Sequence, residues 1–100
     1  MDNYEVFLSP QAYRDLDEIY GYIKEELLAE NAANSTATAI EKAILSLGYM
    51  PYRGAERKVG EFANKGYRQL FVNNYIVVYR VDEGKSTVII VTIKYYHQNF

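Results

Sequence analysis

The stretch Tyr67–Tyr95, YRQLFVNNYIVVYRVDEGKSTVIIVTIKY, decides the fold of this 100-residue chain. It contains three runs rich in β-branched and aromatic residues, separated by two short polar turns. Asn73-Asn74 suits a two-residue turn because asparagine tolerates positive φ, and Asp82-Glu83-Gly84-Lys85 makes the second turn. Two tight connections between three such runs predict an antiparallel meander. Tyr75–Val81 is almost entirely apolar, so we expect it to be the central and most buried strand.

The N-terminal residues predict a short strand followed by a helix. Residues 4–8, YEVFL, alternate in polarity as a half-buried strand does. Ser9-Pro10 then marks a helix start, because serine caps the first turn and proline at the first helical position loses no hydrogen bond. Apolar residues follow at intervals of three or four to about Leu28 and predict one buried face. The acidic residues that we expect on the remaining face are Asp15, Asp17, Glu18, Glu25 and Glu26.

A second amphipathic helix is predicted from a cap at Asn31 to Gly48, with Pro51 just beyond. The short connection makes the two helices antiparallel neighbours. Residues 52–66 are polar and contain three glycines, which indicates a loop with one short extended piece. The order β-α-α-β-β-β predicts a single α+β domain over residues 1–100, in which an antiparallel β-sheet carries the N-terminal α-helical hairpin on one face.

The composition narrows the class of protein. The chain has no cysteine, which excludes disulfides, a thiol nucleophile and thiolate metal ligands. The start MDNYEVFL lacks the features of a signal peptide, and no apolar run is long enough to span a membrane, so we expect a cytoplasmic protein. The net charge is −2, but residues 1–50 carry nine acidic and three basic side chains, whereas residues 51–100 carry eight basic and four acidic ones. The basic half could meet a polyanion; ordinary scatter of surface charge is the alternative.

Several motifs, in order along nearly the whole chain, carry a family resemblance. They are the strand that ends in Ser9-Pro10, the exit Pro51-Tyr52-Arg53 from the helical hairpin, the segment Gly66–Leu70, GYRQL, and the segment Asn74–Asp82, NYIVVYRVD. This set resembles the RelE/ParE toxin superfamily. The resemblance implies a growth-inhibiting toxin of a bacterial type II toxin–antitoxin system, with a cognate antitoxin encoded by an adjacent gene as its partner.

The resemblance leaves the target open. RelE-like members cut mRNA on the ribosome, whereas ParE-like members poison DNA gyrase and are not nucleases. A member that has lost toxicity is the third alternative. The active nucleases commonly carry an arginine about where Ile76 stands here, and a basic pair in the tail where this chain has Tyr96-His97-Gln98-Asn99. On balance the sequence favours a ribosome-dependent mRNA endoribonuclease, with gyrase inhibition as the alternative.

Cutting RNA at a 2′-hydroxyl needs a base, an acid and a cation that holds the phosphorane charge, and it needs no metal ion. We therefore expect neither a metal nor another cofactor. His97, the only histidine, exchanges protons near neutral pH, and with Tyr95 it resembles the catalytic tail of the YoeB-like branch. Arg68 and Arg80 fall on adjacent predicted strands, and their guanidinium groups match phosphate oxygens. The alternatives are that His97 is a solvent-exposed histidine with no catalytic role and that the two arginines form structural ion pairs.

A second set of side chains is expected to approach the RNA backbone or to stack on a base. Its members are Arg57, Lys58, Lys65, Lys94 and Tyr96. Glu56 and Glu61 are possible bases, although a solvated loop carboxylate is the more common reading.

Overall fold

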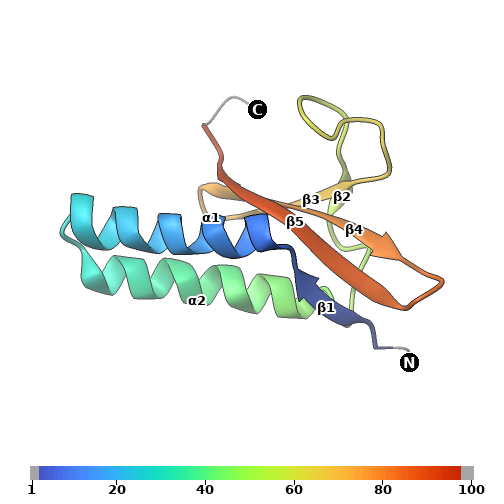
Figure 1. Ribbon diagram of the computed structural model, residues 1–100, viewed down its shortest axis with the longest axis horizontal. Helices are drawn as coiled ribbons and strands as arrows, with labels where there is room; N and C mark the ends of the chain where they lie inside the picture. Colours follow the sequence, from blue (N-terminus) through green and yellow to red (C-terminus); the bar gives the residue numbers. More distant parts are fainter. Residues whose placement is uncertain (1–2, 98–100) are drawn as a thin grey trace.

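A helical hairpin and an open sheet make up residues 3–97, which are the residues that the computed structural model describes (Figure 1). The elements, in chain order, are β1 (Glu5–Leu8), α1 (Pro10–Gly21), the π-helical turn η1 (Tyr22–Glu26), α2 (Glu30–Ser46), β2 (Ala55–Glu56), β3 (Arg68–Val72), β4 (Tyr75–Asp82) and β5 (Thr87–Tyr95). The helices run side by side, and their connected ends project beyond the sheet. The predicted α+β fold class is confirmed.

The strand order in the sheet is β1-β5-β4-β3-β2. The meander β3-β4-β5 is antiparallel, as predicted, and the short β2 pairs antiparallel with β3. β1 lies parallel to β5, with Glu5 opposite Thr87 and Leu8 opposite Ile90. The sheet is therefore mixed and not wholly antiparallel. A four-residue polarity pattern carries no information about strand direction, so the sequence could not show this.

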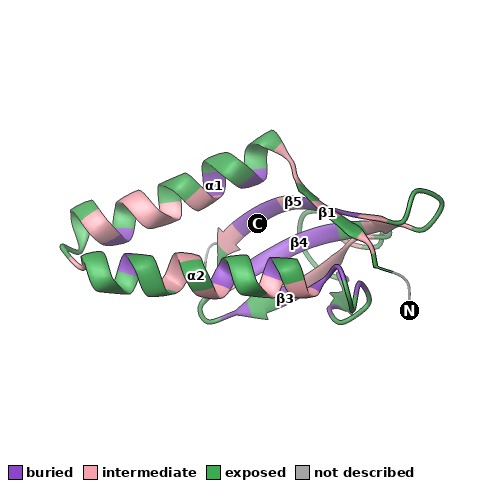
Figure 2. Cartoon of the chain, turned by 90° about the horizontal axis from the view of Figure 1, so that it is seen from below, coloured by how far each residue is buried: buried purple, intermediate pink, exposed green. Residues whose placement is uncertain are grey.

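The core lies between the helices and one face of the sheet. Val77 and Tyr79 of β4 are fully buried against the apolar faces of both helices, and Val78 on the opposite face is fully buried too. The central, most buried strand predicted at Tyr75–Val81 is confirmed (Figure 2). The helix residues at the centre of this core are Ala12, Ile40, Ile44 and Leu47.

The ends of the helices agree with the sequence in part. Ser9 caps α1 as predicted, because its Oγ accepts a hydrogen bond from the Ala12 amide at 3.0 Å. The first helix does not continue as one α-helix to Leu28: α1 ends at Gly21, and η1 follows it. Leu28 then reverses the chain with φ of 51°. α2 begins at Glu30, with Ala29 and not Asn31 at the cap position.

Asp15 is the main departure from the predicted pattern of burial. We expected this residue on the solvent face of the first helix, but it is only 3% exposed. Its position three residues after Ala12 and four before Ile19 places it on the apolar face of α1, which packs against β5.

Candidate functional site

Five aromatic rings gather at the C-terminal end of β5. The Tyr95 ring lies 5.6 Å from Tyr75, and the Tyr96 ring lies 5.4 Å from Phe71. The His97 ring lies 4.8 Å from Tyr96 and 5.3 Å from Tyr95, so it links the two pairs. We call these five residues the C-terminal cluster. Phe71, Tyr95 and Tyr96 are 44–51% exposed, so the cluster offers aromatic surface to a partner.

Strand alternation explains how neighbouring residues reach both faces of the sheet. Tyr95 lies opposite Tyr75, on the side of the helices, whereas Tyr96 turns to the other side, where Phe71 lies. The Tyr96 amide donates a hydrogen bond to the Asn74 carbonyl at 2.5 Å, which fixes the end of β5 against the β3–β4 turn. The structure thus brings two predicted catalytic residues, Tyr95 and His97, together with Tyr96.

A groove of about 840 Å³ runs between the helical hairpin and this end of the sheet. The helices contribute apolar side chains to its wall, including Ile23 and the half-exposed Leu27. The sheet contributes Tyr75 and Tyr95. We call this the helix groove. Its two tyrosines also belong to the C-terminal cluster, so a partner in the groove would touch the cluster directly.

The two predicted phosphate-binding arginines do not meet. Arg68 lies opposite Tyr79, on the face of the sheet that carries the helices. Its Nε donates to the Gly54 carbonyl at 2.9 Å, and its guanidinium lies 5.2 Å from the centre of the Tyr52 ring. Arg80 follows Tyr79 in β4, so its exposed side chain points to the opposite face. Arg68 therefore holds the loop after α2, and Arg80 faces solvent on the other side.

The predicted RNA-binding residues of the loop after α2 differ in how far they are exposed. Arg57 is buried within the loop and does not face solvent: Nε donates to the Glu61 carbonyl at 2.5 Å and Nη1 to Gln69 Oε1 at 2.9 Å. Burial lowers the pKa of the Arg57 guanidinium, although the nearby Glu61 charge opposes that shift. Lys58 and Lys65 are exposed, as expected. The carboxylates Glu56 and Glu61 are exposed too.

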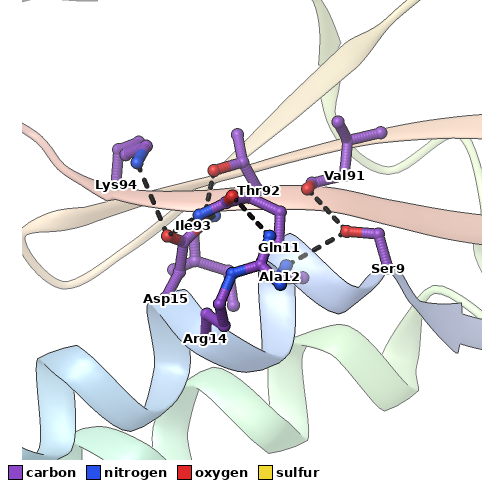
Figure 3. A network of polar contacts seen from close by, with 9 residues as sticks. All are labelled: Ser9, Gln11, Ala12, Arg14, Asp15, Val91, Thr92, Ile93 and Lys94. Atoms are coloured by element: carbon purple, nitrogen blue, oxygen red, sulfur yellow. Dashed lines mark hydrogen bonds and ion pairs between the residues drawn. The ribbon is translucent and has the colours of Figure 1, made fainter.

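Lys94 belongs to a polar network that sequence reasoning missed (Figure 3). Its Nζ lies 3.5 Å from Oδ1 of the buried Asp15, and Gln11 Nε2 donates to the same oxygen at 2.8 Å. Asp15 Oδ2 accepts hydrogen bonds from the Ile93 amide, at 3.0 Å, and from the Thr92 hydroxyl. Burial by itself would raise the pKa of Asp15, but the hydrogen bonds, that from Thr92 first, and the Lys94 charge outweigh it, so the pKa lies below its ordinary value.

Comparison with known proteins gives the family. Residues 6–100 match the model for the ParE toxin of the type II toxin–antitoxin system parDE. The chain belongs to the ParE toxin family. It is therefore a toxin of a type II toxin–antitoxin system, within the wider RelE/ParE superfamily. No curated protein matches the chain by sequence.

Solved structures of ParE and RelE toxins share the fold. A chain of the chromosomal ParDE system of P. aeruginosa aligns with a TM-score of 0.74 at 21% identity, covering 92% of this chain and 95% of that one. A chain of the toxin–antitoxin complex RelBE2 of Mycobacterium tuberculosis aligns with a TM-score of 0.64 at 24% identity, covering 93% and 98%. The free E. coli toxin RelE, as a double mutant, aligns with a TM-score of 0.65 at 12% identity, covering 95% and 85%.

The described part of the ParE-family chain, residues 3–97, shows neither a membrane-spanning helix nor a cluster of metal-binding side chains. None of its helices combines the length and hydropathy needed to cross a membrane. No group of three or more histidine, aspartate or glutamate side chains is placed to hold a metal ion within those residues. Gln98 and Asn99, part of the tail in which the nucleases carry a basic pair, lie outside them.

Proposed function

We propose that this toxin stops growth by binding DNA gyrase, as ParE-like members do, without cutting RNA. The observation that carries the proposal is the position of Arg68 and Arg80 on opposite faces of the sheet. A phosphorane dianion needs cations converging on one point beside the acid and the base. With Arg68 bonded to the Gly54 carbonyl, a phosphate beside His97 would meet neither guanidinium.

Other residues support the same choice. Ile76 stands where the nucleases carry an arginine, and it is only 7% exposed. Lys94 is paired with Asp15, and Arg57 is buried inside its loop. The net charge of −2 also disfavours broad contact with ribosomal RNA. The surface that we propose for the gyrase contact is the exposed C-terminal cluster, because aromatic side chains provide much contact area at low entropic cost.

We also propose that the antitoxin binds in the helix groove. An amphipathic segment with apolar side chains on one face would cover Leu27, Tyr22 and Ile23. Such a segment would also cover Tyr75 and Tyr95, so neutralisation would follow from direct occlusion of part of the C-terminal cluster.

The test is expression of the chain in a bacterium, with DNA replication and translation measured separately, followed by a supercoiling assay with purified gyrase. We expect replication to stop while mRNA stays intact, and supercoiling to fall as toxin is added. Cleavage of mRNA at ribosome-protected codons would overturn the proposal. Normal growth with a folded protein would instead indicate a member that has lost toxicity.

Ribosome-dependent RNA cleavage is the second candidate, and one observation favours it. The His97 ring lies against the exposed rings of Tyr95 and Tyr96, where a splayed base could stack. Under this candidate His97→Ala abolishes mRNA cleavage. Under the gyrase proposal the same variant leaves mRNA intact, as the wild type does.

A further inference from the structure

The outer edge of β5 changes its partner halfway along the strand. β1 pairs with β5 only from Thr87 to Ile90. The register between β4 and β5 then shifts between Val78 and Tyr79, at a β-bulge. From Val91 onward, side chains of the first helix and its cap take the place of a neighbouring strand: Ser9 Oγ donates to the Val91 carbonyl at 2.8 Å, and Asp15 accepts from the Ile93 amide at 3.0 Å (Figure 3).

Asp15 makes most of the hydrogen bonds between the first helix and this part of β5. Thr92, Ile93 and Lys94, three consecutive residues of β5, all donate to its carboxylate. Gln11, one turn earlier in α1, donates to it as well. A buried carboxylate is costly unless donors surround it, and here the donors come mainly from the strand that leads into the C-terminal cluster.

We propose that Asp15 is a positioning residue for the C-terminal cluster. On its inner side, the end of β5 is held by β4, with Tyr95 opposite Tyr75. On its outer side, Asp15 holds the strand, and the cluster begins one residue after Lys94. Without the carboxylate, the last part of β5 has a neighbour on one side only, and Tyr95, Tyr96 and His97 lose their fixed place. The inference rests on the proposed function insofar as the cluster is the surface that contacts the target.

The experiment compares three variants of the purified chain by NMR. Asp15→Ala removes every contact, and Asp15→Asn keeps one acceptor oxygen for the Ile93 amide but loses the ion pair with Lys94. Asp17→Asn is the matched control, since Asp17 is an exposed carboxylate in the same helix. The readouts are hydrogen exchange at the Ile93 amide, the ring contact between Tyr96 and Phe71, and growth inhibition on expression.

For Asp15→Ala we expect exchange at Ile93 to rise about ten-fold while amides in the middle of β4 stay protected. The Tyr96–Phe71 contact should disappear and toxicity should fall. Asp15→Asn should show the same changes to a smaller degree in a protein that remains folded, and Asp17→Asn should match the wild type. The positioning role is overturned if Asp15→Asn cannot be told from Asp17→Asn in exchange and ring contact. Loss of the ring contact with unchanged toxicity would support the positioning role and overturn the cluster as the surface that contacts the target.

These readouts separate the two proposals. Exchange and ring contacts are measured without any target, so they test Asp15 even if the wild-type chain does not inhibit gyrase. If the wild-type chain does not inhibit supercoiling by gyrase, only the gyrase proposal is overturned.

Discussion

The hydroxyl of Tyr79 accepts a hydrogen bond from the Gly54 amide at 2.9 Å, in the middle of the buried core. It also donates to the Pro51 carbonyl at 2.8 Å. One side chain of the central strand thus satisfies two backbone groups of the loop that leaves α2. This loop carries the chain from the helical hairpin to the sheet, so the hydroxyl links the two layers of the fold.

Replacing Tyr79 with phenylalanine should therefore lower the free energy of unfolding by about 1–3 kcal/mol, because both backbone groups lose their buried partner while the ring stays. Chemical denaturation with urea measures the change. Tyr13→Phe, at a tyrosine 59% exposed, is the control and should change stability by less than about 0.5 kcal/mol. Equal effects of the two substitutions would show that the hydroxyl has no special role.

Gly54 leaves no room for a side chain. A Cβ at this position would lie 2.4 Å from the Gln69 carbonyl oxygen and 2.8 Å from the Tyr79 hydroxyl. Gly54→Ala should cost about 1–3 kcal/mol, since the backbone of β3 must move. Gly21→Ala should instead stabilise the chain by about 0.5–1 kcal/mol, because Gly21 is helical and its Cβ would meet no atom within 4 Å apart from its chain neighbours and the backbone of its own helix. Thermal unfolding of both variants tests whether the two substitutions change stability in opposite directions.

Substitutions of Arg68 in β3 and Arg80 in β4 should differ in their effect on the free energy of unfolding. Arg68→Ala removes the hydrogen bond to Gly54 and the contact with the Tyr52 ring, and we expect a loss of about 1–2 kcal/mol. Arg80→Ala, at an exposed position, should alter stability by less than about 0.5 kcal/mol. If Arg68 instead bound a phosphate, its removal would abolish toxicity without lowering the unfolding temperature.

Asp15 should make stability depend on pH at the acid end. Its pKa is lower in the folded chain than in the unfolded chain, so its contribution is present above the unfolded value of about 3.9 and is lost as the pH falls through the lower, folded value. Wild-type stability should therefore fall more steeply than that of Asp15→Asn below about pH 4. Urea unfolding at several pH values measures the two slopes, and parallel slopes would contradict the expectation.

The helix groove should be required for neutralisation. Leu27→Asp places a charge in the groove and should weaken the complex with the adjacently encoded antitoxin at least about ten-fold. Leu45→Asp is the control, because Leu45 is 65% exposed on α2 and does not line the groove. Titration calorimetry with the purified antitoxin gives both affinities. An unchanged affinity for Leu27→Asp would place the antitoxin elsewhere.

Much of the fold could be predicted because local signals agreed with one another. Asn73, at the first predicted turn, has φ of 54°, and the apolar run at Tyr75–Val81 is the centre of the sheet. The register of β1 against β5 was beyond prediction, because it joins residues far apart in sequence. The π-helical turn after Gly21 was missed for a related reason: its apolar spacing hardly differs from that of an α-helix.

The site was harder to predict than the fold. Tyr95 and His97 lie together because they are close in sequence. Arg68 and Arg80 lie on opposite faces because Arg68 pairs with Tyr79 and Arg80 is the next residue of the strand. Counting residue pairs outward from the predicted turn would have given this result. Asp15 lies on the apolar face by its position in the helix, whereas its charge predicts an exposed side chain. A carboxylate at a buried helical position indicates a partner, and here that partner is the edge of a strand.

The pairing of β1 with β5 has a consequence for synthesis. It joins the first strand to the last, and nearby contacts such as Ser9 with Val91 span 82 residues. Non-local contacts of this kind form slowly, and β5 follows the other strands of residues 3–97 along the chain, so it leaves the ribosome after them. The nascent chain can form its helical hairpin early, but it cannot complete the sheet or assemble the aromatic end of β5 until β5 itself has left the ribosome. If the aromatic end of β5 is the surface that contacts the target, as we propose, the toxin cannot act before this strand has been made and paired, and the antitoxin can be supplied during that interval.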